Sequence, residues 1–256
     1  MNPPVIRSRD NALLVRLRKL VRSSSAYRQG GQAWLEGEHL CSSMAERNLR
    51  PTQSVVSESA MQVPHLRALA QWAPRTTVVA DELFKGLSGL ESPARLGYVV
   101  AVPPPDRLDP HSATVVLDRL QDAGNVGSIL RSAAAFGIRQ VVALQGTAAL
   151  WSPKVLRAGM GAHFGLRLHE NLEPAGLDEL DLPLIGTSLQ ATDLLHQARL
   201  PWPCAWVFGH EGQGISHDLQ ARCSMTVRIA QPGGEESLNV AAAAAICLHE
   251  SIRGLS

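Results

Sequence analysis

From residue 111 onward, short runs of β-branched and other apolar residues alternate with stretches in which apolar residues recur every three or four positions. The first pattern predicts buried strands and the second predicts amphipathic helices. Strands are predicted at 114–118, 140–144, 165–168, 183–187, 204–209 and 225–230. Helices are predicted at 125–136, 153–160, 216–221 and 238–253. Because short apolar strands that alternate with helices are typical of a mostly parallel sheet covered on both faces, we expect an α/β fold.

The first hundred residues predict a smaller α/β unit. Leu13, Leu17 and Leu20 follow one face of a helix predicted over 10–22. A second helix is predicted over 38–48, and strands are predicted at 54–57, 76–79 and 97–102. Residues 103–110, Pro-Pro-Pro-Asp-Arg-Leu-Asp-Pro, favour a stiff extended chain. We therefore expect two domains, 1–102 and 111–256, joined by a linker at 103–110.

The composition is that of an ordinary globular protein, with 256 residues of which 45% are hydrophobic and 18% are charged. No apolar run approaches the roughly 20 residues that a membrane span needs, so no membrane segment is expected. The Arg- and Ser-rich start has the character of a transit peptide, but the apolar spacing of 11–20 favours a folded helix. No signal-peptide core is present, and a cytoplasmic location is expected.

Positive charge is concentrated at the start of the chain, although the formal net charge is only +1. Residues 1–30 contain seven Lys and Arg residues against one acid, Asp10. One interpretation is that this positive charge contacts RNA phosphates, which would make RNA binding depend on the salt concentration. The alternative is that the basic residues only form a solvated helix face. The candidate RNA contacts are Arg16, Arg18, Lys19 and Arg28.

The cysteines and histidines do not predict a metal site. Cys41, Cys204, Cys223 and Cys247 are scattered without a C-x-x-C pair, and the nine histidines are dispersed. Free thiols are therefore expected rather than disulfides, and no bound metal is expected.

Three glycine-containing segments each follow an apolar strand and precede a helix. They are Asp122-Ala-Gly-Asn-Val-Gly-Ser-Ile-Leu-Arg131, Val207-Phe-Gly-His-Glu-Gly-Gln-Gly-Ile-Ser216 and Ile229-Ala-Gln-Pro-Gly-Gly-Glu-Glu-Ser-Leu-Asn-Val240. In parallel sheets ligands bind beyond the carboxyl ends of the strands, which is where these segments fall. In this order and spacing they resemble the three motifs of the SpoU (TrmH-type) RNA 2′-O-ribose methyltransferases, which belong to the SPOUT superfamily.

The resemblance implies S-adenosylmethionine as the cofactor and assigns site residues by their positions in the motifs. The implied catalytic residues are Asn125, Arg131, Glu211, Ser237 and Asn239. The implied cofactor contacts are Thr187, Gly209, Ile229 and Leu238. A Rossmann cofactor site is disfavoured, because its Gly-rich turn must follow an early strand, and the glycines of 159–165 have the wrong spacing.

Side-chain chemistry narrows the implied roles. Arg131 matches the residue that the family uses as activator of the 2′-hydroxyl. An arginine stays protonated in proteins, however, so phosphate binding or stabilisation of the developing alkoxide suits it better. Glu211, held between glycines, predicts support of the cofactor loop rather than proton transfer. Asn125, Ser237 and Asn239 are also good helix caps, and both roles are compatible.

The resemblance also implies a trefoil knot in the second domain and a homodimer in which Asn125 and Arg131 act across the interface. The Tyr27-Arg28 step and Gln32–Gly37 are similar to the substrate-binding domain of many SpoU enzymes. Enzymes with such a domain mostly modify large-subunit ribosomal RNA, so rRNA is expected over tRNA. Ala123 and Ala230 replace family prolines, and Glu235 replaces an apolar residue. A non-catalytic RNA-binding protein of the same fold is therefore the alternative.

Overall fold

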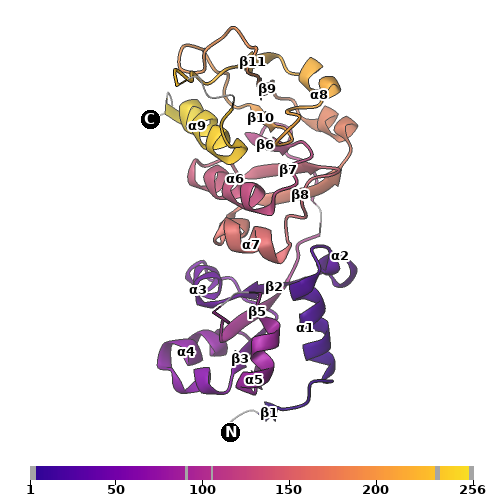
Figure 1. Cartoon of the computed structure of the whole chain (residues 1–256), viewed down its shortest axis with the longest axis vertical. Helices are drawn as coiled ribbons and strands as arrows, with labels where there is room; N and C mark the ends of the chain where they lie inside the picture. Colours follow the sequence, from indigo (N-terminus) through magenta and orange to yellow (C-terminus); the bar gives the residue numbers. More distant parts are fainter. Residues whose placement is uncertain (1–3, 90–91, 105, 234–236, 254–256) are drawn as a thin grey trace. The chain divides into compact units, whose positions relative to one another are not determined.

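The computed structural model describes residues 4–89, 92–104, 106–233 and 237–253 (Figure 1). Its contacts divide the chain into two compact units. The first unit comprises Met1–Pro104 with Trp151–Phe164, and the second comprises Pro105–Leu150 with Gly165–Ser256. Residues 151–164, which lie in the second predicted domain, belong to the first of these units. The division into domains 1–102 and 111–256 with a linker at 103–110 stays a prediction.

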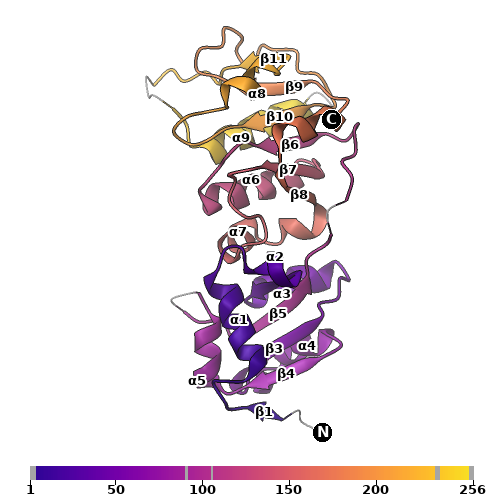
Figure 2. The same cartoon turned by 90° about the vertical axis from the view of Figure 1, so that its right-hand side faces the viewer.

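The first unit is built on a mixed sheet with the strand order β1-β4-β3-β5-β2. Strands β1, β4 and β3 are parallel, and β5 and β2 are antiparallel to their neighbours. In Figures 1 and 2, α1 lies on one face of this sheet and α3 and α4 lie on the other. The strands are β1 (Val5–Ile6), β2 (Gln32–Glu36), β3 (Gln53–Ser57), β4 (Thr76–Val79) and β5 (Leu96–Ala101). The helices are α1 (Ala12–Arg22), α2 (Ala26–Gly30), α3 (Glu38–Glu46), α4 (Pro64–Trp72), α5 (Asp81–Phe84) and α7 (Pro153–Gly159), with 3₁₀ turns η1 (Ser59–Gln62), η2 (Lys85–Leu87) and η3 (Ala162–Gly165).

Helix α1 shows how the local sequence sets an element. The Asn11 side chain accepts a hydrogen bond from the Leu13 main-chain nitrogen at 3.0 Å and so caps the helix. The helix buries Leu14, Leu17 and Leu20. The predicted face contained Leu13 in place of Leu14, and that position was wrong because the helix turns Leu14 into the core.

The second unit is a parallel sheet with the strand order β11-β9-β10-β6-β7-β8. This confirms the predicted α/β fold with a mostly parallel sheet. The strands are β6 (Thr114–Leu117), β7 (Gln140–Leu144), β8 (Arg167–Leu172), β9 (Leu184–Thr187), β10 (Ala205–Phe208) and β11 (Met225–Val227). The helices are α6 (Ala123–Ala135), α8 (His217–Ala221) and α9 (Val240–Arg253), with a 3₁₀ turn η4 (Pro174–Glu179). The strand predicted at 165–168 begins at Arg167 because its pairing with β7 begins there, at Gln140.

Helices cover both faces of the second sheet, with α6 and α9 side by side on one face and α8 on the other (Figure 1). Successive side chains of β10 point to opposite faces of the sheet, so this strand packs against the helices on both faces. Trp206 points towards α9, and its Nε1–H donates to the Ser251 hydroxyl oxygen at 2.8 Å. The neighbours Ala205 and Val207 lie in a cluster that also holds Leu177 of η4 and Leu219 of α8. The sheet is thus buried on both faces, and its polar side chains gather at the strand ends.

Candidate active site

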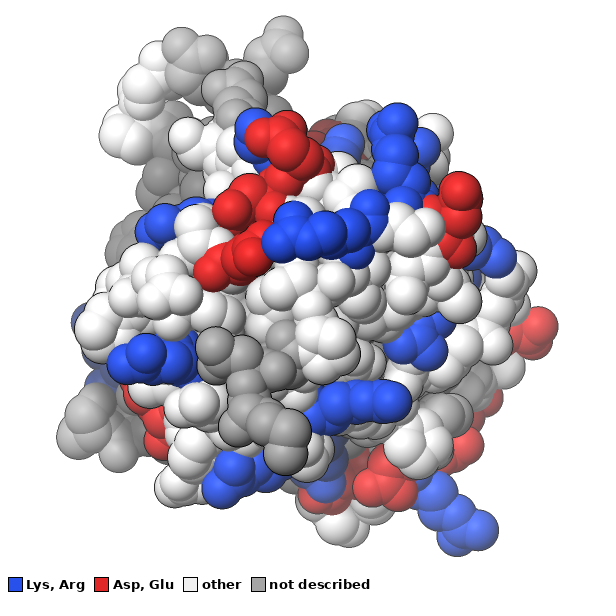
Figure 3. Space-filling view, turned by 90° about the horizontal axis from the view of Figure 1, so that it is seen from below, with Lys and Arg blue, Asp and Glu red and all other residues white. Residues whose placement is uncertain are grey.

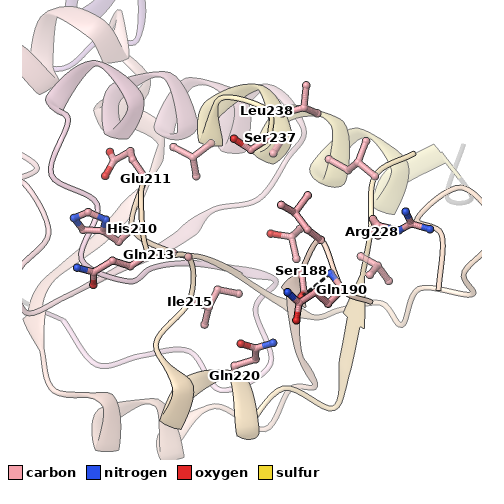
Figure 4. A pocket seen from close by; sticks show the side chains of 18 of the residues that line it. Ser188, Gln190, His210, Glu211, Gln213, Ile215, Gln220, Arg228, Ser237 and Leu238 are labelled. Atoms are coloured by element: carbon pink, nitrogen blue, oxygen red, sulfur yellow. Dashed lines mark hydrogen bonds between the residues drawn. The ribbon is translucent and has the colours of Figure 1, made fainter. Parts of the chain in front are cut away.

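The carboxyl ends of β9, β10 and β11 lie at one edge of the second sheet, because the three strands are parallel neighbours. A cavity of about 520 Å³ opens at this edge. In Figure 4, His210, Glu211 and Gln213 line one side of it, and Ser188, Gln190 and Arg228 line the opposite side. Ser237 and Leu238 lie above them. The lining also includes Thr187, Gly209, Gly214, Ile215, Gln220, Ile229 and Gln231.

All four predicted cofactor contacts line this one cavity. Thr187 ends β9, Gly209 follows β10, and Ile229 and Leu238 flank the loop between β11 and α9. Glu211 and Ser237 from the predicted catalytic set line it as well. Glu235, where the sequence departs from the family, lies outside the described residues. The assignment of Thr187, Gly209, Ile229 and Leu238 as cofactor contacts stays a prediction, but the fold brings these four positions together from three separate strand ends.

Gly209 is required by close packing of the main chain. A β-carbon built on it would lie 2.1 Å from the Ile215 nitrogen and 2.2 Å from the Gly214 carbonyl carbon. Gly214 itself has a φ of +69°, a conformation that glycine adopts readily. The loop 209–216 therefore folds back on its own start, and this double layer of main chain forms one wall of the cavity.

The three motifs meet through a chain of side-chain hydrogen bonds. The Asn239 Nδ2–H donates to the Asn125 Oδ1 at 2.9 Å, and the Asn125 Nδ2–H donates to Glu211 Oε1 at 3.3 Å. Glu211 also accepts from the main-chain nitrogens of Asp122 at 3.1 Å and Gln121 at 3.3 Å. Each of the predicted residues Asn125, Glu211 and Asn239 comes from a different motif, so the arrangement joins the ends of β6, β10 and β11.

Chemistry fixes the direction of each bond in this chain. A carboxylate only accepts, so Asn125 must turn its amide nitrogen to Glu211 and its oxygen to Asn239. Burial raises the pKa of Glu211, but the bonds from main-chain nitrogens and from Asn125 outweigh it and hold the pKa below its usual value. Glu211 is therefore an ionised acceptor whose oxygens are already engaged, which suits support of the loop rather than proton transfer.

Helix capping and site geometry are combined in Asn239 but not in Asn125. Helix α6 starts at Ala123, two residues earlier than predicted: Asp122 is its cap, and the Asp122 carboxylate accepts from the Asn125 nitrogen at 2.7 Å. The side chain of Asn125 is therefore free for Glu211. Asn239 does cap α9, since its Oδ1 accepts from the nitrogens of Ala241 at 2.9 Å and Ala242 at 3.2 Å.

Arg131 lies apart from this chain of bonds. It is six residues beyond Asn125 on α6, so the two side chains point in different directions around the helix. Arg131 is exposed, and it makes no hydrogen bond or ion pair with any residue that the structure describes. It does not line the cavity. Within one chain, the structure thus brings together Asn125, Glu211, Ser237 and Asn239 but not Arg131.

The predicted RNA contacts in the first unit fall on different faces. Arg16 and Lys19 are exposed on α1, at a spacing that puts them on one face with Arg22. Arg18 instead donates to the Arg9 carbonyl oxygen at 2.6 Å, and Arg28 lies over the Tyr27 ring at 5.7 Å from its centre. The face of the molecule in Figure 3 mixes basic and acidic side chains and carries no large area of one sign.

Three site residues escaped the sequence reasoning. Asp118 and Arg119 follow β6 and hold the loop 209–216, and Gln231 lies in the cavity wall. An acid directly after a buried strand was a usable signal for Asp118. Gln231 had none, because its place in the third segment does not tell where its side-chain oxygen lies, and that atom is buried in the folded chain.

Comparison with known proteins agrees with this geometry. The family model described as SpoU rRNA Methylase family matches residues 112–249. An uncharacterised tRNA/rRNA methyltransferase of Synechocystis sp. is 32% identical over 97% of this chain and 93% of its own. The 23S rRNA (guanosine(2553)-2′-O)-methyltransferase RlmP of Bacillus subtilis is 28% identical over 86% and 88%. The SpoU methyltransferase AviRb of Streptomyces viridochromogenes, solved with AdoMet, has the same fold, with a TM-score of 0.87 at 24% identity over 96% of this chain and 98% of its own. The chain described here belongs to the SpoU rRNA methylase family.

Proposed function

We propose that this protein transfers a methyl group from S-adenosylmethionine to a ribose 2′-hydroxyl of RNA, with large-subunit ribosomal RNA as the favoured substrate. The observation that carries the proposal is the bonded chain of Asn125, Glu211 and Asn239 beside a cavity lined by the four implied cofactor contacts. Membership of the SpoU family supports it, as does the 23S rRNA activity in the name of the Bacillus relative. We propose a cytoplasmic location, which an rRNA substrate of this kind supports.

The cavity fits a cofactor of this size and polarity. Its volume of about 520 Å³ lies within the usual range of small-molecule sites. Gly209 leaves main-chain groups bare at the wall, and the buried Gln231 side-chain oxygen has no hydrogen-bond partner among the described residues. Thr187, Gly209, Ile229 and Leu238 would hold the cofactor, whose sulfonium supplies an electrophilic methyl group.

The residues around the cavity contribute position and charge. Glu211 is ionised and occupied by three donors, so it orders the loop instead of taking the hydroxyl proton. Arg131 remains protonated, and we assign it to a phosphate or to the developing alkoxide of the ribose. Holding donor and acceptor in line supplies a large part of the rate, on the order of 7–11 kcal/mol in favourable cases.

A homodimer would bring Arg131 into the site. Asn125 is already bonded to Glu211 and Asn239 of its own chain, so we assign the action across the interface to Arg131 alone. Exposed residues of α6 and α9 lie beside one another on one face of the sheet, and Ile246 is 42% exposed there. Family membership supports the dimer and the trefoil knot.

Mixing two inactive variants tests the shared site. Arg131→Ala and Asn239→Ala proteins, refolded together, should regain about a quarter of wild-type activity, since half of the dimers are mixed and each holds one intact site. Each variant refolded alone is the control. Activity that stays at the level of the controls would show that Arg131 acts within its own chain.

Methyl transfer to RNA tests the activity. Tritiated S-adenosylmethionine is incubated with total RNA that lacks 2′-O-methyl groups, and the products are separated by size. Label in large ribosomal RNA that is lost with Arg131→Ala is the expected result. Label in tRNA would keep the chemistry and overturn the substrate. Absence of label, together with absence of cofactor binding, would favour a non-catalytic RNA-binding protein.

The α1 surface is proposed as an RNA contact. Arg16→Ala with Lys19→Ala should flatten the dependence of RNA affinity on salt, by roughly 0.7 in the log–log slope for each lost phosphate contact. The control is Arg67→Ala with Arg75→Ala, two other exposed arginines of the first unit. Equal slopes for the two double variants would identify the α1 face as merely solvated.

A further inference from the structure

An ion pair between adjacent residues at the end of β6 lies under the wall of the cavity. The Arg119 Nε–H donates to Asp118 Oδ1 at 2.9 Å, and an Nη2–H donates to Oδ2 at 3.2 Å. The Asp118 side chain is 4% exposed. Burial raises the pKa of Asp118, but the bonds from Arg119 and Ser216 outweigh it and keep the pKa below its usual value.

Both members of this pair reach the loop 209–216. Asp118 Oδ2 accepts from the Ser216 nitrogen at 2.7 Å, at the end of the loop. Arg119 donates from Nη1 to the Gln213 side-chain oxygen at 3.0 Å and from Nη2 to the Gly214 carbonyl oxygen at 3.4 Å, at its tip. Because the loop is held at two places, its cavity-facing residues 213–215 are fixed against the end of β6.

The main chain at Arg119 is strained, which a purely structural ion pair would not require. Its φ is +59°, in the left-handed region that disfavours residues with a side chain. Glycine would adopt this conformation without strain. A strained main chain persists only where the surrounding contacts hold it in place, and strained residues cluster at functional sites.

We propose that Asp118 and Arg119 act as a positioning pair, which holds the loop 209–216 in the conformation that binds the cofactor. The inference rests on the proposed cofactor site. The pair does not line the cavity itself and acts through Gln213, Gly214 and Ser216. Its loss should raise the KM for S-adenosylmethionine and leave kcat almost unchanged.

Two variants of Arg119 separate positioning from stability. Arg119→Ala removes the guanidinium and keeps the strained main chain, whereas Arg119→Gly removes both. The matched control is Arg222→Ala, which removes an arginine that bonds Asp178 and the Pro174 carbonyl oxygen in the same unit, away from the loop. Readouts are the Kd for S-adenosylhomocysteine by calorimetry, the KM and kcat, the melting temperature and amide hydrogen exchange of 212–216.

Both Arg119 variants should bind S-adenosylhomocysteine at least tenfold more weakly, with kcat within about twofold of wild type and faster exchange confined to 212–216. Arg119→Gly should melt at a higher temperature than Arg119→Ala, while the control keeps wild-type affinity. Wild-type affinity in both variants, or exchange that accelerates throughout the unit, would overturn the inference. If the wild-type protein does not bind S-adenosylhomocysteine, the proposed function fails, and the exchange of 212–216 still decides whether the pair holds the loop.

Discussion

Replacement of Gly209 by alanine tests the close packing on which the cavity depends. The added methyl group would lie 2.1 Å from the Ile215 nitrogen and 2.4 Å from the Gly214 oxygen, both main-chain atoms. The two segments must separate by more than about 1 Å to reach van der Waals contact. Overpacking of this kind costs about 1–3 kcal/mol. Because the displaced segment is the cavity wall, a shift of that size also costs up to about 100-fold in catalysis.

Thermal unfolding measures the loss of stability, methyl-transfer kinetics measure the loss of catalysis, and calorimetry with S-adenosylhomocysteine measures binding at the displaced wall. The melting temperature of Gly209→Ala should fall by roughly 2–4 °C for each kcal/mol. Gly212→Ala is the matched control for stability, since a β-carbon there meets nothing closer than 3.9 Å. If Gly209→Ala has the same melting temperature as Gly212→Ala and binds S-adenosylhomocysteine with wild-type affinity, residue 209 does not approach 214–215 closely in solution. The geometry of the site described above would then be wrong.

Three further substitutions test other contacts. Folding lowers the pKa of Glu211, so its contribution to stability is complete above the unfolded-state pKa of about 4.3 and is lost as the pH falls through the lower folded-state value. Glu211→Gln should therefore be less stable than wild type at pH 7, and the difference should narrow in acid denaturation below about pH 4.3. Asn239→Asp keeps the cap of α9 but cannot donate to Asn125, so kcat should fall at least tenfold while the melting temperature stays at the wild-type value. A wild-type kcat, or a melting temperature that falls together with kcat, would contradict this. Trp206→Phe leaves Ser251 without its donor and a gap in the core, which should cost about 2–4 kcal/mol in urea unfolding, with activity per folded molecule retained.

The sequence predicted the strands of the second unit well, because their apolar runs are short and bounded by polar residues. Strand β7 (Gln140–Leu144) has the predicted bounds, and β6 and β10 differ by one residue at each changed end. Strand β2 (Gln32–Glu36) was not predicted. Its five residues mix polar ends with a bulky apolar centre, and its extended form depends on pairing with β5, which lies 60 residues further along the chain.

The position of 151–164 also depends on tertiary contacts. Helix α7 was predicted from its apolar spacing, but the spacing does not identify the surface on which a helix packs. In the structure α7 packs against β2, and the Arg157 guanidinium lies 3.7 Å from the buried carboxylate of Glu36. Both residues are unremarkable in the sequence, so the domain to which this helix belongs follows from the fold alone.

The candidate site was predicted as three separate motifs. The structure adds the reason why Glu211, Asn125 and Asn239 have these side chains and not others. Glu211 accepts only, so Asn125 must offer an amide nitrogen to it and is left with an oxygen for the next residue. Asn239 must then donate to that oxygen while its own oxygen caps α9. An aspartate at either position would place two acceptors face to face, and a serine is too short to act at both ends. The cap preference of asparagine, visible in the sequence, and its place in the site are therefore two consequences of one amide with a donor at one end and an acceptor at the other.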